Sequence, residues 1–181
     1  MVSALADSMQ LAAADDGRLR AAVEAHTAAV WRVLRRNGVP AAEADDAAQR
    51  VFVVLSRHME AVDEGGERPF LMRTATLIAS ETRRTIRRRR ETGEAMPELP
   101  IEGALPDEVC AQREAIAQLD GVLDAMDESL RAVFVLYELE EMTMAEISET
   151  LELPPGTVAS RLRRARACFE ELCSTLRREA P

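Results

Sequence analysis

The stretch MTMAEISETLELPPGTVASRLRRARACFEEL, residues 142–172, predicts two helices joined by a tight turn. Thr143 and Glu146 have the T-x-x-E spacing of a capping box, in which each side chain satisfies a free backbone N–H at the start of a helix. A Pro-Pro-Gly run then ends the first helix, and Pro155 suits the first turn of the next, where a missing N–H costs nothing. Two helices around so short a turn form a helix-turn-helix motif.

The second helix of this motif separates into two faces on a helical wheel. The predicted core face consists of Val158, Leu162, Ala165 and Phe169. The opposite arc holds Ser160, Arg163, Arg164 and Ala167, flanked by Arg161 and Arg166. A recognition helix needs this division, because central side chains contact base edges while flanking arginines hold phosphates. A solvated arginine face is the alternative, but the absence of acids from 155 to 168 favours nucleic acid.

Charge is strongly partitioned along the chain, although its formal net charge is −9. Residues 71–90 carry seven arginines and one acid, residues 91–154 carry two arginines and seventeen acids, and residues 155–181 carry six arginines and three acids. The two basic segments can present local faces to a polyanion. The acidic middle would discourage indiscriminate DNA binding, or mimic nucleic acid inside a basic channel.

Helical periodicity runs almost throughout, and no segment alternates like a strand. Helices are expected over 18–37, 41–60, 70–90, 107–125, 127–140, 143–152 and 155–178, with a loop at 63–69. We therefore predict an all-α protein of two small helical domains. Its parts are an N-terminal tail (1–17), a first domain (18–90), an acidic linker containing Pro and Gly (91–106), and the helix-turn-helix domain (107–181).

Composition argues against several classes of protein. The three cysteines, Cys110, Cys168 and Cys173, lack the spacing of a disulfide framework or a zinc site, and fit thiols in a reducing compartment. The two histidines, His26 and His58, stand on predicted helices without partners. No Gly-rich phosphate loop or nucleophile elbow occurs. We predict no catalytic residue, metal, cofactor or small-molecule substrate.

The N-terminus and the hydropathy pattern predict a soluble, cytoplasmic protein. The first residues lack the basic start of a secretory signal, and Asp7 interrupts them early. No apolar run approaches the roughly 18 residues of a membrane span, so no direct membrane insertion is expected.

Three segments resemble the extracytoplasmic-function (ECF, group IV) sigma factors of the sigma-70 family. The segment LRAVFVLYELEEMTMAEISETLELPPGTVASRLRRAR is similar to the fourth region of that family. The segment VWRVLRRNGVPAAEADDAAQRVF resembles the start of its second region, and FLMRTATLIASETRRTIRRRR resembles the helix that ends the second region. The resemblance implies a transcription initiation factor that binds core RNA polymerase, directs it to two-part promoter DNA and assists melting.

Roles for individual residues follow from this resemblance. At the upstream (minus-thirty-five) element, Ser160, Arg163 and Arg164 would face bases, while Thr157, Arg161 and Arg166 would meet phosphates. The downstream (minus-ten) element would be held by Arg73, Arg83, Arg84, Arg87 and Arg88. The polymerase clamp would be bound by Asp46, Gln49 and Arg50, although acids near a helix start also favour the helix dipole. An anti-sigma factor is a further possible partner.

Three other functions remain open from the sequence. A stand-alone helix-turn-helix regulator would protect an operator without polymerase, whereas a sigma factor binds promoter DNA poorly alone. A sigma-mimicking adaptor that titrates an anti-sigma protein would not need two intact arginine blocks. A carboxylate-based nuclease has no residues that single it out.

Overall fold

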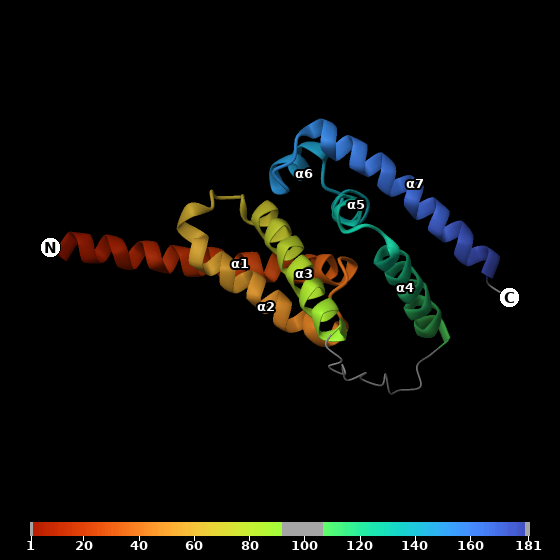
Figure 1. The fold of residues 1–181 in the computed structure, drawn as a ribbon. Coiled ribbons are helices and arrows are strands. Elements are labelled where there is room, and N and C mark those ends of the chain that lie inside the picture. The colour runs from red at the N-terminus through yellow and green to blue at the C-terminus, as the bar shows by residue number, and fades with distance from the viewer. Residues whose placement is uncertain (1, 92–106, 180–181) are drawn as a thin grey trace.

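The computed structural model describes residues 2–91 and 107–179, with side chains for residues 16–89, 91 and 114–178, and each regular element in these ranges is a helix (Figure 1). The first helical group comprises α1 (Val2–Arg36), α2 (Ala41–His58), a short 3₁₀ turn η1 (Met59–Ala61) and α3 (Glu67–Glu91). The all-α prediction is confirmed for the described residues. The predicted linker lies outside them, apart from Glu91 at the end of α3.

α1 begins at Val2 instead of at residue 18, so the segment predicted as an N-terminal tail is helical. That stretch contains no proline and is rich in Ala and Leu, which favour a helix. The predicted stop at Asn37-Gly38 is confirmed. Gly38 has φ +87°, its N–H bonds to the Arg35 carbonyl (2.9 Å), and the Val39 N–H bonds to the Leu34 carbonyl (3.1 Å). This is a Schellman motif, which favours glycine at the left-handed position.

The first group packs α1, α2 and α3 around one apolar centre. On α2 the buried positions recur at helical spacing, at Ala44, Ala47, Ala48, Val51 and Leu55. Val30 and Leu34 of α1 meet them, both fully buried. α3 begins at Glu67, three residues earlier than expected, because Pro69 falls in the first turn where its missing N–H is tolerated.

The second group comprises α4 (Asp107–Ala125), α5 (Glu128–Phe134), η2 (Val135–Leu139), α6 (Met144–Thr150) and α7 (Pro155–Glu179). The single helix expected over 127–140 is therefore wrong. After α5 the chain widens into the π-helical turn η2, in which the Glu140 N–H bonds to the Val135 carbonyl five residues back, at 3.1 Å. The wider turn shifts the register, so that Tyr137 and Glu138 face α7 while Glu140 is buried towards α1.

α6 and α7 form the predicted helix-turn-helix, and α5 supports it. Phe134 of α5 stacks on Phe169 of α7, with ring centroids 4.8 Å apart. Ile147 of α6 is fully buried and Leu151 is half-buried, as predicted for the inner side of that helix. Apolar side chains of α5, α6 and α7 thus hold the motif together.

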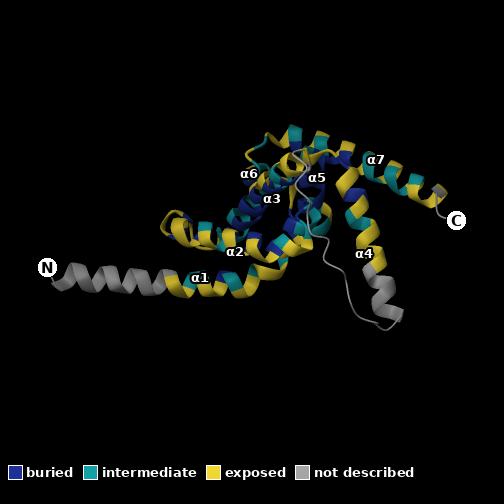
Figure 2. Cartoon of the chain, turned by 60° about the horizontal axis from the view of Figure 1, so that its bottom comes forward, coloured by how far each residue is buried: buried dark blue, intermediate teal, exposed yellow. Residues whose placement is uncertain are grey.

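The two groups lie against each other, with α4 and η2 beside α1 and α6 beside α3 (Figure 1). Their buried apolar side chains belong to one continuous cluster. Figure 2 shows buried positions where the helices meet and exposed positions along the outer faces. Within the described ranges, no helix is both long and apolar enough to span a membrane.

Candidate nucleic-acid interface

α7 buries one face and exposes the other along its first half. The buried face consists of Val158, Leu162 and Ala165, each with at most 4% of its surface exposed. These are three of the four positions assigned to the core from the sequence, and the fourth, Phe169, is half-buried. The burial fixes which side of α7 faces solvent.

Ser160, Arg163 and Arg164 lie on the exposed side of α7. The Ser160 hydroxyl donates a hydrogen bond to the Thr157 carbonyl oxygen, 3.0 Å away. This bond uses the hydroxyl proton and leaves the oxygen able to accept from a base or a water. The predicted placement of the three side chains is confirmed, while their contact with bases stays a prediction.

Arg166 is held at the edge of this face by residues of η2. Its Nε donates to Glu138 Oε1 at 2.6 Å, and its guanidinium carbon lies 5.2 Å from the centroid of the Tyr137 ring. The Glu138 hydrogen bond raises the pKa of Arg166, so the side chain stays cationic. Thr157 and Arg161 are half-buried. The sequence did not single out Glu138 or Tyr137, because no local pattern marks a residue that acts across a π-helical turn.

Side-chain hydrogen bonds fix the start of α6 and the turn between α6 and α7. Thr143 donates to Glu146 Oε2 from its backbone N–H and its hydroxyl, both at 2.7 Å, and Glu146 N–H returns a bond to Thr143 Oγ1 at 3.3 Å. The backbone N–H of Thr143, then its hydroxyl, lower the pKa of Glu146. Ser148 Oγ donates to the Leu153 carbonyl at 2.5 Å. The predicted capping box is confirmed.

α3 carries the five arginines predicted for the downstream element, and the structure divides them. Arg73 is hydrogen-bonded to Glu152, in the turn between α6 and α7. Arg83 is half-buried, and its Nη1 has no acceptor among the described residues. The side chains that remain exposed are Arg84, Arg87 and Arg88.

The residues predicted to bind polymerase lie together on the outer face of α2. Asp46, Gln49 and Arg50 are all exposed. Arg50 Nη2 lies 3.2 Å from Glu81 Oε2 of α3. Both side chains of this pair are more than half exposed, so the pair contributes little to stability. The three residues share one exposed surface, and their binding to polymerase stays a prediction.

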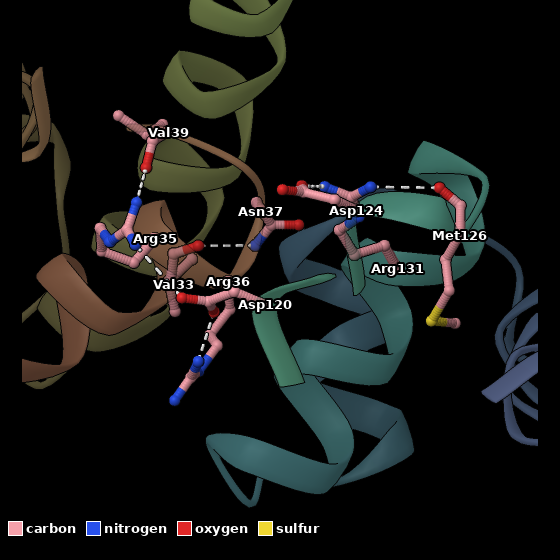
Figure 3. A network of polar contacts seen from close by, with 9 residues as sticks. All are labelled: Val33, Arg35, Arg36, Asn37, Val39, Asp120, Asp124, Met126 and Arg131. Carbon is pink, nitrogen blue, oxygen red and sulfur yellow. Dashed lines mark hydrogen bonds and ion pairs between the residues drawn. The ribbon is translucent and has the colours of Figure 1, made fainter. Parts of the chain in front are cut away.

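Ion pairs and hydrogen bonds join the first helical group to the second. Arg32 donates twice to Glu140, from Nε to Oε1 at 3.0 Å and from Nη2 to Oε2 at 2.8 Å. Arg68 Nη2 donates to the Glu140 backbone oxygen at 2.6 Å. Arg35 and Arg36 both bind Asp120 of α4 (Figure 3). Each contact pairs an arginine of the first group with an oxygen of the second.

A cavity of about 490 Å³ lies between the groups at the end of α3. Its charged lining comprises Arg35, Arg83, Arg84, Arg87, Asp120, Asp124 and Glu128. Beside it, the fully buried Arg131 donates to Asp124 Oδ1 at 2.8 Å and to the Met126 carbonyl at 3.2 Å (Figure 3). Burial, and then the charge of Arg83, lower the pKa of Arg131. The cavity is thus lined by arginines of the first group facing acids of the second.

The part of the chain that the structure describes holds no group of three or more His, Cys, Asp or Glu side chains placed to bind a metal ion. Cys168 and Cys173 are half-buried thiols.

Residues 116–169, which span the second part of α4, then α5, η2, α6 and the first part of α7 with its exposed arc, match the family "Sigma-70, region 4". The ECF RNA polymerase sigma factor SigL of Mycobacterium tuberculosis is 30% identical over 153 residues, which cover 83% of this chain and 86% of SigL. The chain belongs to the ECF RNA polymerase sigma factors. Sigma factors are transcription initiation factors and not enzymes, which agrees with the predicted lack of a catalytic centre.

The chain is also similar to a longer relative and to two solved structures. The ECF RNA polymerase sigma factor SigE of Mycolicibacterium smegmatis is 30% identical over 148 residues, and the chain spans 57% of its length. Among solved structures, CnrH in complex with the cytosolic domain of CnrY is 25% identical with a TM-score of 0.69, covering 91% of this chain and 96% of that one. RpoE of Bartonella quintana, bound to the anti-sigma factor NepR, is 17% identical with a TM-score of 0.62, covering 84% and 94%, and shares the fold.

Proposed function

We propose that this ECF sigma factor binds core RNA polymerase, directs it to two-part promoters and assists DNA melting. The observation that carries the proposal is the exposed arc of α7, opposite a fully buried face, in a member of this family. A helix of this kind can enter a major groove while its buried face keeps it attached to the domain.

At the upstream element, Arg163, Arg164 and Ser160 contact base edges. Arginine can bond a guanine through two acceptors in the major groove, and serine can bond any base. Arg161 and Thr157 bind phosphates on one flank of the helix, and Arg166 binds a phosphate on the other. To bind the phosphate, Arg166 exchanges its hydrogen bond to Glu138 for one to the DNA backbone. Solvent can reach both side chains, so this exchange is possible.

At the downstream element, arginines along α3 bind the phosphate backbone of the melting strand. Arg84, Arg87 and Arg88 are exposed for this purpose. Arg73 and Arg83 join them when the second helical group moves away. Asp46, Gln49 and Arg50 on the outer face of α2 bind the polymerase clamp.

The protein acts in the cytoplasm, where polymerase and promoter DNA are found, and an anti-sigma factor holds it inactive. Support for the last point comes from solved structures with the same fold, one of which is an assembly with an anti-sigma factor.

In vitro transcription of fragmented genomic DNA tests the proposal. Core polymerase is used with and without the protein, and the 5′ ends of the transcripts are sequenced. A sigma factor will produce new start sites that share two sequence elements at fixed spacing. Transcript ends that do not change when the protein is added would refute the proposal. Protection of an operator by the protein alone would instead identify a stand-alone regulator.

A further inference from the structure

An arginine in the wall of the cavity at the end of α3 has a buried nitrogen without a hydrogen-bond acceptor in the described part of the chain. This atom is Nη1 of Arg83, a half-buried residue. The side chain passes close to Gly38, since a Cβ there would lie 3.0 Å from Arg83 Cδ. A buried guanidinium N–H that lacks an acceptor is costly, because it has lost its water without gaining a partner. The cavity therefore favours a ligand that supplies acceptor oxygens.

A second arginine beside the cavity also lacks an acceptor. Arg131 is fully buried, and its Nε has no hydrogen-bond partner among the described residues. A Cβ at Gly38, a residue of the cavity wall, would lie 2.8 Å from Arg131 Nη1. Burial, and then the charge of Arg83, lower the pKa of Arg131. The two cations thus disfavour each other, and a bound anion would offset their repulsion.

The charges of the cavity wall leave arginine in excess. Three acids line it, and two of them already accept hydrogen bonds from arginine, namely Asp120 from Arg35 and Arg36, and Asp124 from Arg131. The third acid, Glu128, shares the wall with Arg83, Arg84 and Arg87 of α3. Arg87 also lies 4.0 Å from Glu91, but both side chains of that pair are largely exposed, so the contact is weak.

We propose that this cavity is a binding site for a small phosphorylated compound, whose phosphate oxygens accept hydrogen bonds from Arg83, Arg84 and Arg87. A guanidinium group can bind phosphate through two parallel N–H···O bonds, and the oxygens of one phosphate can be shared by several guanidinium groups. The volume of about 490 Å³ lies within the range of small-molecule sites, roughly 300–1,000 Å³.

The rest of the wall indicates which part of the ligand is recognised. Val39, Pro40 and Ile86 give it an apolar side that can cover carbon atoms of the ligand. Among the described residues, the wall has no aromatic ring on which a base could stack. Recognition is therefore of the phosphate. Neither polymerase nor promoter DNA takes part, so the site stands independently of the proposed function.

Isothermal titration calorimetry of the full chain with pyrophosphate tests the site, with ionic strength held constant by sodium chloride. Two variants each remove one arginine of the wall, Arg83→Gln and Arg87→Gln. The matched control is Arg89→Gln, which removes an exposed arginine of the same helix that does not line the cavity. Thermal unfolding by circular dichroism without ligand verifies that the variants are folded. Arg87 is exposed, so its variant keeps the test valid if Arg83→Gln does not fold.

We expect saturable binding of one pyrophosphate per wild-type chain. Arg83→Gln will weaken it about tenfold or more and Arg87→Gln about three- to tenfold, because each variant loses charge-assisted hydrogen bonds to the phosphate. The control will change the affinity less than about twofold. A lack of saturable binding would overturn the proposal. Equal weakening in Arg89→Gln would also overturn it, since that result would show only a general attraction of anions to a basic helix.

Titrations with inorganic phosphate and with adenosine diphosphate then distinguish the sources of the phosphate group. Tighter binding of the nucleoside diphosphate than of pyrophosphate would identify a nucleotide ligand. Equal or weaker binding would identify a ligand recognised by its phosphates alone. Either result supports the site, provided that Arg83→Gln or Arg87→Gln weakens the binding and the control does not. If the wild type supports transcription by core polymerase but binds none of the three compounds, only the phosphate site is wrong.

Discussion

Arg32 and Glu140, 108 residues apart in the sequence, form two hydrogen bonds that join the two helical groups of the protein. The Glu140 side chain is only 3% exposed, whereas Arg32 is 50% exposed. The hydrogen bond with Glu140 raises the pKa of Arg32. A nearly buried carboxylate thus depends on a single guanidinium from the other helical group.

Replacing Arg32 with alanine will lower the free energy of unfolding by about 1–2 kcal/mol, because Glu140 is then left buried without its charged partner. Arg20→Ala, an exposed arginine on the same helix, is the matched control and will change stability by less than about 0.5 kcal/mol. Urea denaturation measures both. Equal losses in the two variants would show that the ion pair contributes nothing beyond helix propensity.

Gly38→Ala will destabilise the protein more than Gly65→Ala. Both glycines have positive φ, +87° and +83°, so each substitution carries backbone strain of about 1 kcal/mol. A Cβ at Gly38 would also lie 2.8 Å from Arg131 Nη1 and 2.9 Å from Asp124 Oδ1, while nothing lies within 4 Å at Gly65. We expect a difference of about 1–2 kcal/mol between the variants by thermal unfolding. Identical melting temperatures would mean that the groups do not approach each other at Gly38.

Thr143→Ala will remove the capping box and cost about 1 kcal/mol of stability. Glu146→Gln keeps a hydrogen-bonding side chain and loses only the charge. Hydrogen bonds from Thr143 lower the pKa of Glu146 below 4.5, so its carboxylate stabilises the folded state at neutral pH. This contribution is lost as the pH falls below about 4.5 and through the folded pKa.

The stability difference between the wild type and Glu146→Gln will therefore shrink between pH 5 and pH 3, as measured by denaturant unfolding at each pH. A difference that grew on acidification would contradict the assigned sign. Since the capping box starts the helix before the turn, both variants should also increase hydrogen exchange in α6 more than in α5.

Arg164→Ala and Arg161→Ala will weaken promoter binding by polymerase holoenzyme in different ways. Arg164 is exposed on the arc that we propose to face the bases, so its loss should cost about 1–3 kcal/mol on the preferred upstream element and little on altered ones. Arg161 lies on the flank, so its loss should weaken binding on all sequences and reduce the salt slope by about one unit. Binding titrations at several salt concentrations distinguish the two roles. Losses that are equal on every promoter for both variants would refute the assignment.

Local signals were sufficient to predict the helix-turn-helix from the sequence. The capping box, the Pro-Pro-Gly turn and the apolar spacing on α7 all depend on residues a few positions apart, and the structure reproduces each. The start of α1 and the π-helical turn were missed. The sequence before residue 18 contains no capping motif that marks where α1 begins. No residue pattern marks the hydrogen bond from the Glu140 N–H to the Val135 carbonyl.

The contacts of the arginines could not be predicted, since they depend on how the two groups pack. The sequence showed separate basic and acidic blocks, and segments of opposite charge attract each other. It did not show that Glu152 would meet Arg73, or that Glu138 would hold Arg166. Such pairings follow from tertiary structure and have no fixed spacing in the chain.

Run-off transcription on a single promoter found by the genomic experiment tests the central claim most directly. Core polymerase is assayed alone, with the protein, and with the protein on templates altered in the upstream or the downstream element. The account predicts no specific transcript from core polymerase alone, a defined transcript with the protein, and its loss when either element is changed. A transcript that appeared without the protein, or that persisted on both altered templates, would contradict the claim that this chain directs polymerase to its promoters.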